Sequence, residues 1–211
     1  GGQLDLGAVG KGIACDVIGD WLESGSKNAS EKAEEETEDV TAAQTSEEKA
    51  ADVEAGTFSV GGSVLVYGAK PDGTDWKIGI QDPRGEEGTN MAAVSISQEA
   101  GQRCYLSTSG DYEKYIEKDG KRYHHIMDPS TGAPADSGLI SVTILSDSGF
   151  LSDALSTACF VAGLEKGIEL ADSYGVKAIF IDENKQVYVT EETKEILTIL
   201  KKEYVLKNEA E

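Results

Sequence analysis

Short apolar runs, either alternating with polar residues or continuous over the length of a strand, recur along most of the chain. The runs with this pattern are 57–67, 76–81, 91–97, 103–108, 139–145, 176–181 and 186–190. The turn dipeptide Asp119-Gly120 separates two further runs and predicts a hairpin between 112–117 and 121–126. The pattern therefore predicts a sheet of many short strands.

Helical segments are predicted between and after these strands, at 8–23, 151–162, 164–174 and 191–202. In the first helix, the apolar residues expected on one face are Val9, Ile13, Val17, Ile18, Trp21 and Leu22. Helices and strands are interspersed without a regular βαβ alternation. We therefore expect an α+β fold, in which a mixed or antiparallel sheet packs against helices.

One stretch, residues 24–56, differs in composition from the rest. It contains ten acidic and three basic residues and no aromatic residue, so it carries −7 of the net charge of −20. Its residues include helix formers, but no apolar stripe recurs at helical spacing. We interpret it as an acidic, flexible insertion within a single domain spanning 1–211. An acidic activation or calcium-binding segment is the alternative.

The charge balance narrows the possible ligands. The 211 residues include 39 acidic and 19 basic ones, and such a surface repels nucleic acids and anionic membrane surfaces. A small phosphate-bearing ligand is compatible with it if a cation mediates the contact. No apolar run reaches the roughly 20 residues of a membrane helix. Cys15, Cys104 and Cys159 lack the spacing of a metal site, so we expect free, buried thiols.

Two sets of residues are suited to phosphate or metal chemistry. The segment GAVGKG (7–12) opens the first predicted helix, where free N–H groups attract anions. It is neither a P-loop nor a dinucleotide-binding fingerprint, and a tight turn without a ligand explains it equally well. Asp153 and Thr157 are four residues apart in a predicted helix, so their oxygens share a face and suit Mg²⁺. The alternative is a simple contact of Asp153 with the helix dipole.

His124 and His125 are the only histidines in the sequence, and they end a predicted strand. Histidine is a common base near neutral pH. Neighbouring strand residues point to opposite faces, so only one of the two can face a given site. An exposed pair without a catalytic role is the alternative. The small-residue segments SVGGS (59–63) and STSGDY (107–112) are compatible with turns, bulges or a ligand lying against the backbone.

Taken in chain order, these segments are similar to the motifs of one family. Five segments resemble the ApbE family, the FAD:protein FMN transferases: LDLGAVGKGIACD (4–16), SVGGSVLVYGAKPDGTDWKIGIQDP (59–83), STSGDYEKYIEKDGKRYHHIMDPSTGAPA (107–135), GLISVTIL (138–145) and SDALSTACFVAG (152–163). The resemblance extends from about residue 2 to residue 190 and is interrupted by the insertion. Each motif alone is weak, whereas five in order are specific.

The resemblance implies a T-fold-like α+β architecture and a Mg²⁺-dependent reaction with FAD as the substrate. FMN is transferred to a threonine hydroxyl of a target flavoprotein, and AMP leaves. By the same resemblance, Asp153, Thr157 and the backbone carbonyl of Gly10 are the metal ligands. His125 corresponds to the histidine implicated in catalysis. The residues expected at the FAD site are Gly7, Ile13 and Ile126, with Lys11 as a candidate for holding phosphate.

Two alternatives use the same residues. An FAD pyrophosphatase would employ the metal site with water in place of the threonine, and a non-catalytic FAD-binding lipoprotein domain would bind FAD without reaction. Family members also have a portion before the DLG segment that contributes to the flavin pocket. We therefore expect a truncated, soluble domain, whose full-length form is an extracytoplasmic lipoprotein held at the membrane by an anchor absent from this chain. The expected partners are FAD and a flavoprotein with an acceptor threonine, and not nucleic acid.

Overall fold

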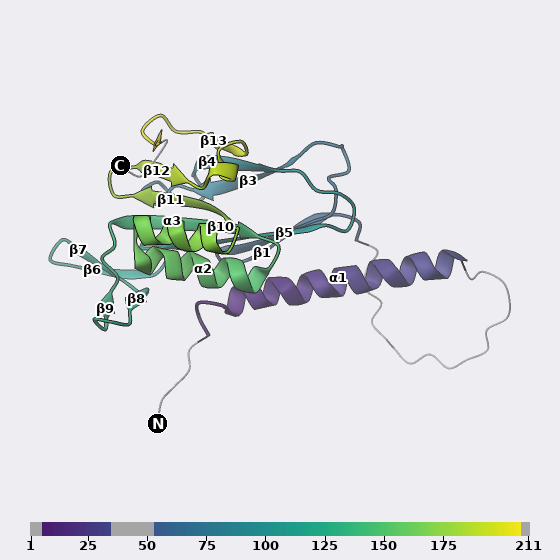
Figure 1. The fold of residues 1–211 in the computed structure, drawn as a ribbon, viewed down its shortest axis with the longest axis horizontal. Helices are drawn as coiled ribbons and strands as arrows, with labels where there is room; N and C mark the ends of the chain where they lie inside the picture. The colour runs from purple at the N-terminus through teal and green to yellow at the C-terminus, as the bar shows by residue number, and fades with distance from the viewer. Residues whose placement is uncertain (1–5, 35–52, 208–211) are drawn as a thin grey trace, which may run out of the picture.

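The structure, a computed structural model, describes residues 6–34 and 53–207. The middle of the acidic insertion lies outside these residues, so the flexible insertion stays a prediction. The first part of the insertion, from residue 24, continues the first helix. Helix α1 (Gly10–Glu34) therefore runs beyond the predicted 8–23 and extends away from the sheets (Figure 1).

Among the residues that the structure describes, seven strands form the central sheet. In spatial order they are β1 (Gly56–Val60), β2 (Ser63–Tyr67), β5 (Arg103–Gly110), β10 (Leu139–Ser146), β11 (Lys177–Asp182), β12 (Gln186–Val189) and β14 (Val205–Leu206). Neighbours are antiparallel up to β12, which pairs with β14 in parallel. The run predicted at 57–67 forms two strands, because Gly61 turns the chain with a φ of 59°.

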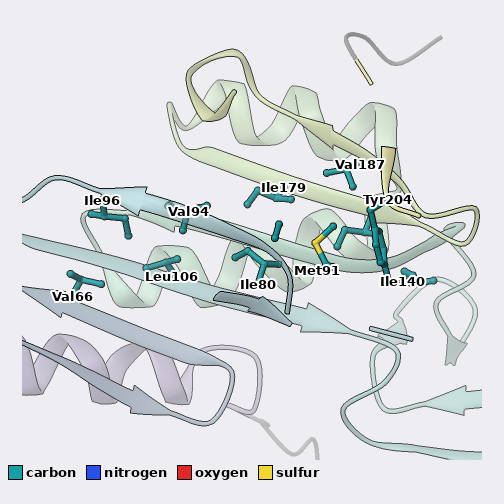
Figure 2. Close-up of a cluster of buried hydrophobic side chains, with 13 residues drawn as sticks. Val66, Ile80, Met91, Val94, Ile96, Leu106, Ile140, Ile179, Val187 and Tyr204 are labelled. Carbon is teal, nitrogen blue, oxygen red and sulfur yellow. The ribbon is translucent and has the colours of Figure 1, made fainter. Parts of the chain in front are cut away.

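A smaller sheet packs on one face of the central sheet. It consists of β13 (Leu197–Ile199), β4 (Asn90–Ile96) and β3 (Trp76–Gln81). A hydrophobic cluster that includes Met91, Val94, Leu106, Ile179 and Val187 fills the space between the two sheets (Figure 2). The burial of these side chains is what joins the two sheets into one core.

Helices α1, α2 (Gly149–Ala162) and α3 (Leu164–Ser173) cover the opposite face (Figure 1). Strand β11 shows the alternation between the faces: Ile179 and Ile181 belong to the cluster between the sheets, and Ala178 and Phe180 to the cluster under the helices. None of the described helices is both long and apolar enough to cross a membrane. The predicted α+β class, with a mixed sheet packed against helices, is confirmed.

Two small hairpins project beside the central sheet (Figure 1). Strand β6 (Tyr115–Lys118) pairs with β7 (Lys121–His124), and β8 (Met127–Asp128) pairs with β9 (Ala133–Pro134). Asp119 and Gly120 form the turn of the first hairpin with φ values of 54° and 72°. Positive φ at both central residues is typical of such tight turns, so the predicted hairpin is confirmed.

The prediction of a helix at 191–202 is wrong. The segment forms a short 3₁₀ turn, η1 (Glu191–Thr193), followed by strand β13. Thr193 is fully buried, and Leu197 pairs with Val94 of β4. Pairing with a strand about a hundred residues earlier in the chain therefore overrides the local helical preference.

The apolar face predicted for the first helix is only partly the buried one. Leu22 is buried, but Ile13, Val17 and Trp21 are 40%, 62% and 45% exposed. The helix packs on a neighbouring face that carries Cys15 and small residues, which allow its backbone to approach α2 closely. The packing of α1 therefore depends on backbone approach more than on its large apolar side chains.

The cysteines are free thiols, as predicted. Cys15 and Cys159 are buried, and Cys104 is partly buried. Burial raises the pKa of each thiol to about 11, so all three are neutral near pH 7. None of them is therefore poised as a nucleophile.

Candidate functional site

The start of α1 crosses α2 at very close range. A Cβ atom added to Gly12 would lie 2.0 Å from the carbonyl oxygen of Gly149, so only glycine fits there. Asp16 holds the same crossing, because its two carboxylate oxygens accept hydrogen bonds of 2.7 Å from the N–H groups of Gly149 and Phe150. This carboxylate from α1 caps the N-terminus of α2, next to the N-cap residue Ser148.

Asp153 lies one turn further along α2 and is fully buried. Its Oδ2 accepts a hydrogen bond of 2.9 Å from the N–H of Gly12. Its Oδ1 receives no hydrogen bond from the described residues, and the ammonium of Lys11 lies 3.2 Å away as an ion pair. A buried carboxylate oxygen with unused lone pairs is suited to a hard cation.

Hydroxyl groups line the face of α2 that meets β5. Thr157 Oγ1 is 3.0 Å from the hydroxyl of Ser109, which is also 2.8 Å from the hydroxyl of Ser156. One turn earlier, the hydroxyls of Ser152 and Ser107 are 2.9 Å apart. Sequence reasoning missed this network. Its signal is the matching spacing of serines, at i and i+4 in the helix and at i and i+2 in the strand.

The turn between β1 and β2 lies beside the side chain of Lys11. A Cβ atom on Gly61 would be 3.1 Å from the Lys11 Cδ, and one on Gly62 would be 3.9 Å from the Cε. The Gly62 carbonyl accepts a hydrogen bond of 2.9 Å from the N–H of Thr108 in β5. Three segments that were separate in the sequence, GAVGKG, SVGGS and STSGDY, therefore meet at the crossing of α1 and α2.

His124 is a buried, structural histidine. Its Nε2 lies 3.0 Å from the Ala135 carbonyl, and its Nδ1 accepts a hydrogen bond of 3.3 Å from the N–H of Ile126. The ring packs edge-on against Phe160 of α2, with 5.5 Å between the centroids. Because a carbonyl only accepts, Nε2 carries the proton, and both nitrogens are occupied. His124 is therefore unsuited to act as a base.

His125, the next residue, is exposed. Its Nδ1 lies 3.2 Å from the carbonyl of Lys114, so the hydrogen-bond network assigns the proton to Nδ1. The lone pair of Nε2 then remains to accept a proton. Of the two histidines, His125 has the tautomer and the exposure that a general base requires.

The structure brings some predicted site residues together and leaves others apart. Lys11 and Asp153 are in contact, and Thr157 lies one turn beyond Asp153 on α2. Gly10 is exposed, and an added Cβ there would meet nothing within 4 Å. The exposed residues Gly7 and Ile13 flank this helix start. His125 and Ile126 instead follow β7, and Ile126 is only 5% exposed and belongs to the hydrophobic cluster that contains Phe160.

No group of three or more His, Cys, Asp or Glu side chains within residues 6–34 and 53–207 is placed to hold a metal ion. A cation at the crossing of α1 and α2 would therefore rely on the single carboxylate of Asp153. Hydroxyl and backbone carbonyl oxygens would supply its other protein ligands. Such a sparse donor set is typical of Mg²⁺, which keeps several waters or phosphate oxygens.

The chain is similar to proteins of the ApbE family over most of its length. The sequence profile of the ApbE family matches residues 40–180. A protein of Treponema pallidum (strain Nichols), named FAD:protein FMN transferase, is 35% identical over 211 residues, covering 98% of this chain and 51% of that protein.

Solved structures show the same relationship. The ApbE protein of Thermotoga maritima has a TM-score of 0.68 at 32% identity, over 92% of this chain and 53% of that one. The Pseudomonas stutzeri flavinyl transferase ApbE has a TM-score of 0.64 at 30% identity, over 92% and 51%. The chain thus spans about half the length of these relatives.

Proposed function

Because the chain belongs to the ApbE family, we propose that it provides the site at which FMN is moved from FAD to a threonine hydroxyl of a target flavoprotein, with release of AMP. The relatives that carry the name FAD:protein FMN transferase support the activity, and the one from Treponema pallidum is about twice as long as this chain. The observation that carries the proposal is the buried carboxylate of Asp153. Its Oδ1 accepts no hydrogen bond from the described residues and lies beside the ammonium of Lys11.

The donors at the crossing of α1 and α2 fit Mg²⁺. We assign the metal to Asp153 Oδ1, the hydroxyl of Thr157 and the backbone carbonyl of Gly10, all of which are hard oxygen donors. When bound, Mg²⁺ supplies neutralisation of the charge on the pyrophosphate. This assignment also resolves a conflict of charge, since an acidic chain of net charge −20 would otherwise repel its anionic substrate.

The residues of this chain have separate roles in the proposed transfer. The threonine Oγ forms a bond to the phosphorus of the FMN half of FAD, and the bond from that phosphorus to the bridging oxygen breaks. The bridging oxygen leaves with AMP, and the threonine proton passes to Nε2 of His125, whose lone pair accepts it in the tautomer that donates from Nδ1 to the Lys114 carbonyl. Exposure at this position suits a substrate that is itself a protein.

The substrate FAD would lie along the start of α1. Lys11, whose side chain is 37% exposed, is proposed to contact a phosphate. Gly7 and Ile13 are exposed on either side of it and are proposed to contact FAD. Ile126 is proposed beside the flavin nucleotide, where its backbone is held by Ala135 and His124.

Location and target are further parts of this proposal, and the family resemblance supports them. We propose that the full-length form is an exported lipoprotein anchored at the membrane. Its partner would be a flavoprotein with an accessible threonine. Neither proposal involves nucleic acid, in keeping with the acidic surface.

The products formed from FAD test the proposed function. The protein in its full natural length is incubated with FAD, MgCl₂ and a threonine-containing peptide of a target flavoprotein. We expect the peptide to gain the mass of one FMN group, with an equal amount of AMP released. A matched peptide with valine in place of the threonine is expected to stay unmodified, because valine has no hydroxyl.

Two other outcomes would contradict transfer. Free FMN and free AMP in equal amounts, with an unmodified peptide, would identify an FAD pyrophosphatase. FAD that is retained without any cleavage would identify a binding protein. Mass spectrometry of the peptide and chromatography of the nucleotides separate the three results.

A further inference from the structure

The two side chains of the ion pair between Lys11 and Asp153 differ strongly in their exposure to solvent. The Asp153 side chain is 1% exposed, and its Oδ2 is held by the N–H of Gly12 at 2.9 Å. Its Oδ1 faces the Lys11 ammonium at 3.2 Å without forming a hydrogen bond. The Lys11 side chain, in contrast, is 37% exposed. One partner is fixed in the core, and the other stands at the border with solvent.

The glycine pair of the β1–β2 turn provides the space for this lysine. The Lys11 stem passes close to Gly61 and Gly62, where any side chain would narrow its path. Lys11 therefore reaches Asp153 along a surface that lacks side chains. A flexible four-carbon stem on such a surface can retract without disturbing the backbone.

The ammonium and a divalent cation would need the same carboxylate oxygen. Mg²⁺ binds oxygen ligands at about 2.0–2.1 Å. A cation on Oδ1 would then lie within roughly 5 Å of an ammonium that stayed in place, and the single negative charge of the carboxylate would not offset both cations. The two cations therefore compete for Asp153.

We propose that Lys11 is an exchangeable counter-ion, which neutralises Asp153 until a divalent cation binds and is then released toward the phosphates of FAD. This inference rests on the proposed function, in which Asp153 is a metal ligand. It adds that Lys11 weakens binding of the metal alone and strengthens binding of FAD once the metal is present. Metal and substrate would thereby bind cooperatively, because each contributes to moving Lys11.

Binding of Mn²⁺ to the 211-residue chain without FAD tests the exchange. Free Mn²⁺ is measured by electron paramagnetic resonance during a titration. We expect Lys11→Met to bind Mn²⁺ about fivefold more tightly than the wild type, which is about the effect of losing one partly exposed ion pair. Lys70→Met removes the same charge from a pair with the exposed Asp72, so its affinity is expected to stay within about twofold of the wild type.

A second measurement uses the unmodified chain, so it does not depend on the folding of a variant. Lysines are acylated with an N-hydroxysuccinimide ester, and the rate at each site is mapped by peptide mass spectrometry. Release of Lys11 from Asp153 is expected to raise its acylation rate when Mn²⁺ is added. The rate at Lys70 is expected to be unaffected by Mn²⁺.

The outcomes separate this inference from the proposed function. Unchanged or weaker Mn²⁺ binding by Lys11→Met, or a Lys11 acylation rate independent of Mn²⁺, would overturn the exchange. If Asp153→Asn nevertheless abolishes Mn²⁺ binding, the metal site stands without the exchange. If Asp153→Asn binds Mn²⁺ as the wild type does, both the exchange and the proposed metal site are wrong.

Discussion

The Asp153→Asn variant is expected to lose FMN transfer by about a thousandfold while it keeps its fold. Asparagine has the size of aspartate and retains an oxygen for the N–H of Gly12, but it lacks the charge that would hold the metal. Metal stabilisation of the developing charge contributes several kcal/mol to such reactions, which corresponds to a rate factor of about 10³. The rate of AMP release from FAD at saturating Mg²⁺, in the full-length protein, measures the effect.

A suitable control is Asp172→Asn, which removes the same charge from an exposed position at the end of α3. Its rate is expected to match that of the wild type. Thermal unfolding of both variants shows whether the fold is retained. If Asp153→Asn folds and releases AMP at more than about a tenth of the wild-type rate, Asp153 does not hold an essential metal.

The Gly12→Ala variant is expected to lose about 3 kcal/mol or more of its unfolding free energy. The added Cβ would lie 2.0 Å from the Gly149 carbonyl oxygen and 2.7 Å from the Asp153 Cβ. Because the nearest obstacle is the backbone of α2, no side-chain rotation relieves the clash. The helices must separate, which also lengthens the hydrogen bond between Gly12 and Asp153. Urea unfolding followed by circular dichroism measures the loss.

Gly10→Ala is the matched control, two residues earlier in the same helix. A Cβ at this position would meet nothing within 4 Å. Its unfolding free energy is expected to stay within about 0.5 kcal/mol of the wild type. Equal urea midpoints for Gly12→Ala and Gly10→Ala would show that α1 does not pack on α2 as described.

Local sequence patterns predicted most of the strands and named several of the residues that meet where α1 crosses α2. Alternating or continuous apolar runs located β3, β5 and β10 to within two residues, since the apolar pattern of a strand is a local property of the sequence. The spacing of Asp153 and Thr157 placed both on one helical face. Their oxygens, a lysine and small residues favour phosphate and metal chemistry, and this chemistry stays a prediction.

Contacts between distant segments could not be predicted in the same way. Asp16 lies one turn after Gly12, yet its role as a cap of α2 depends on where the two helices cross. The C-terminal segment has local helical character, but its residues around Leu197 pair with β4, which no local pattern reveals. The buried face of α1 also differs from the predicted one, because contacts with a distant helix, α2, determine it. Small residues, including Gly12, set the crossing, and large apolar side chains such as Val17 remain exposed.

A divalent cation at the crossing of α1 and α2 is the central feature of the proposed site. Anomalous diffraction from crystals grown with Mn²⁺ in place of Mg²⁺ would locate that cation without reference to activity. We expect one strong anomalous peak within about 2.2 Å of Asp153 Oδ1, close to the hydroxyl of Thr157 and the carbonyl of Gly10. Full Mn²⁺ occupancy elsewhere, with Lys11 still paired to an unliganded Asp153, would show that Asp153 does not bind the metal.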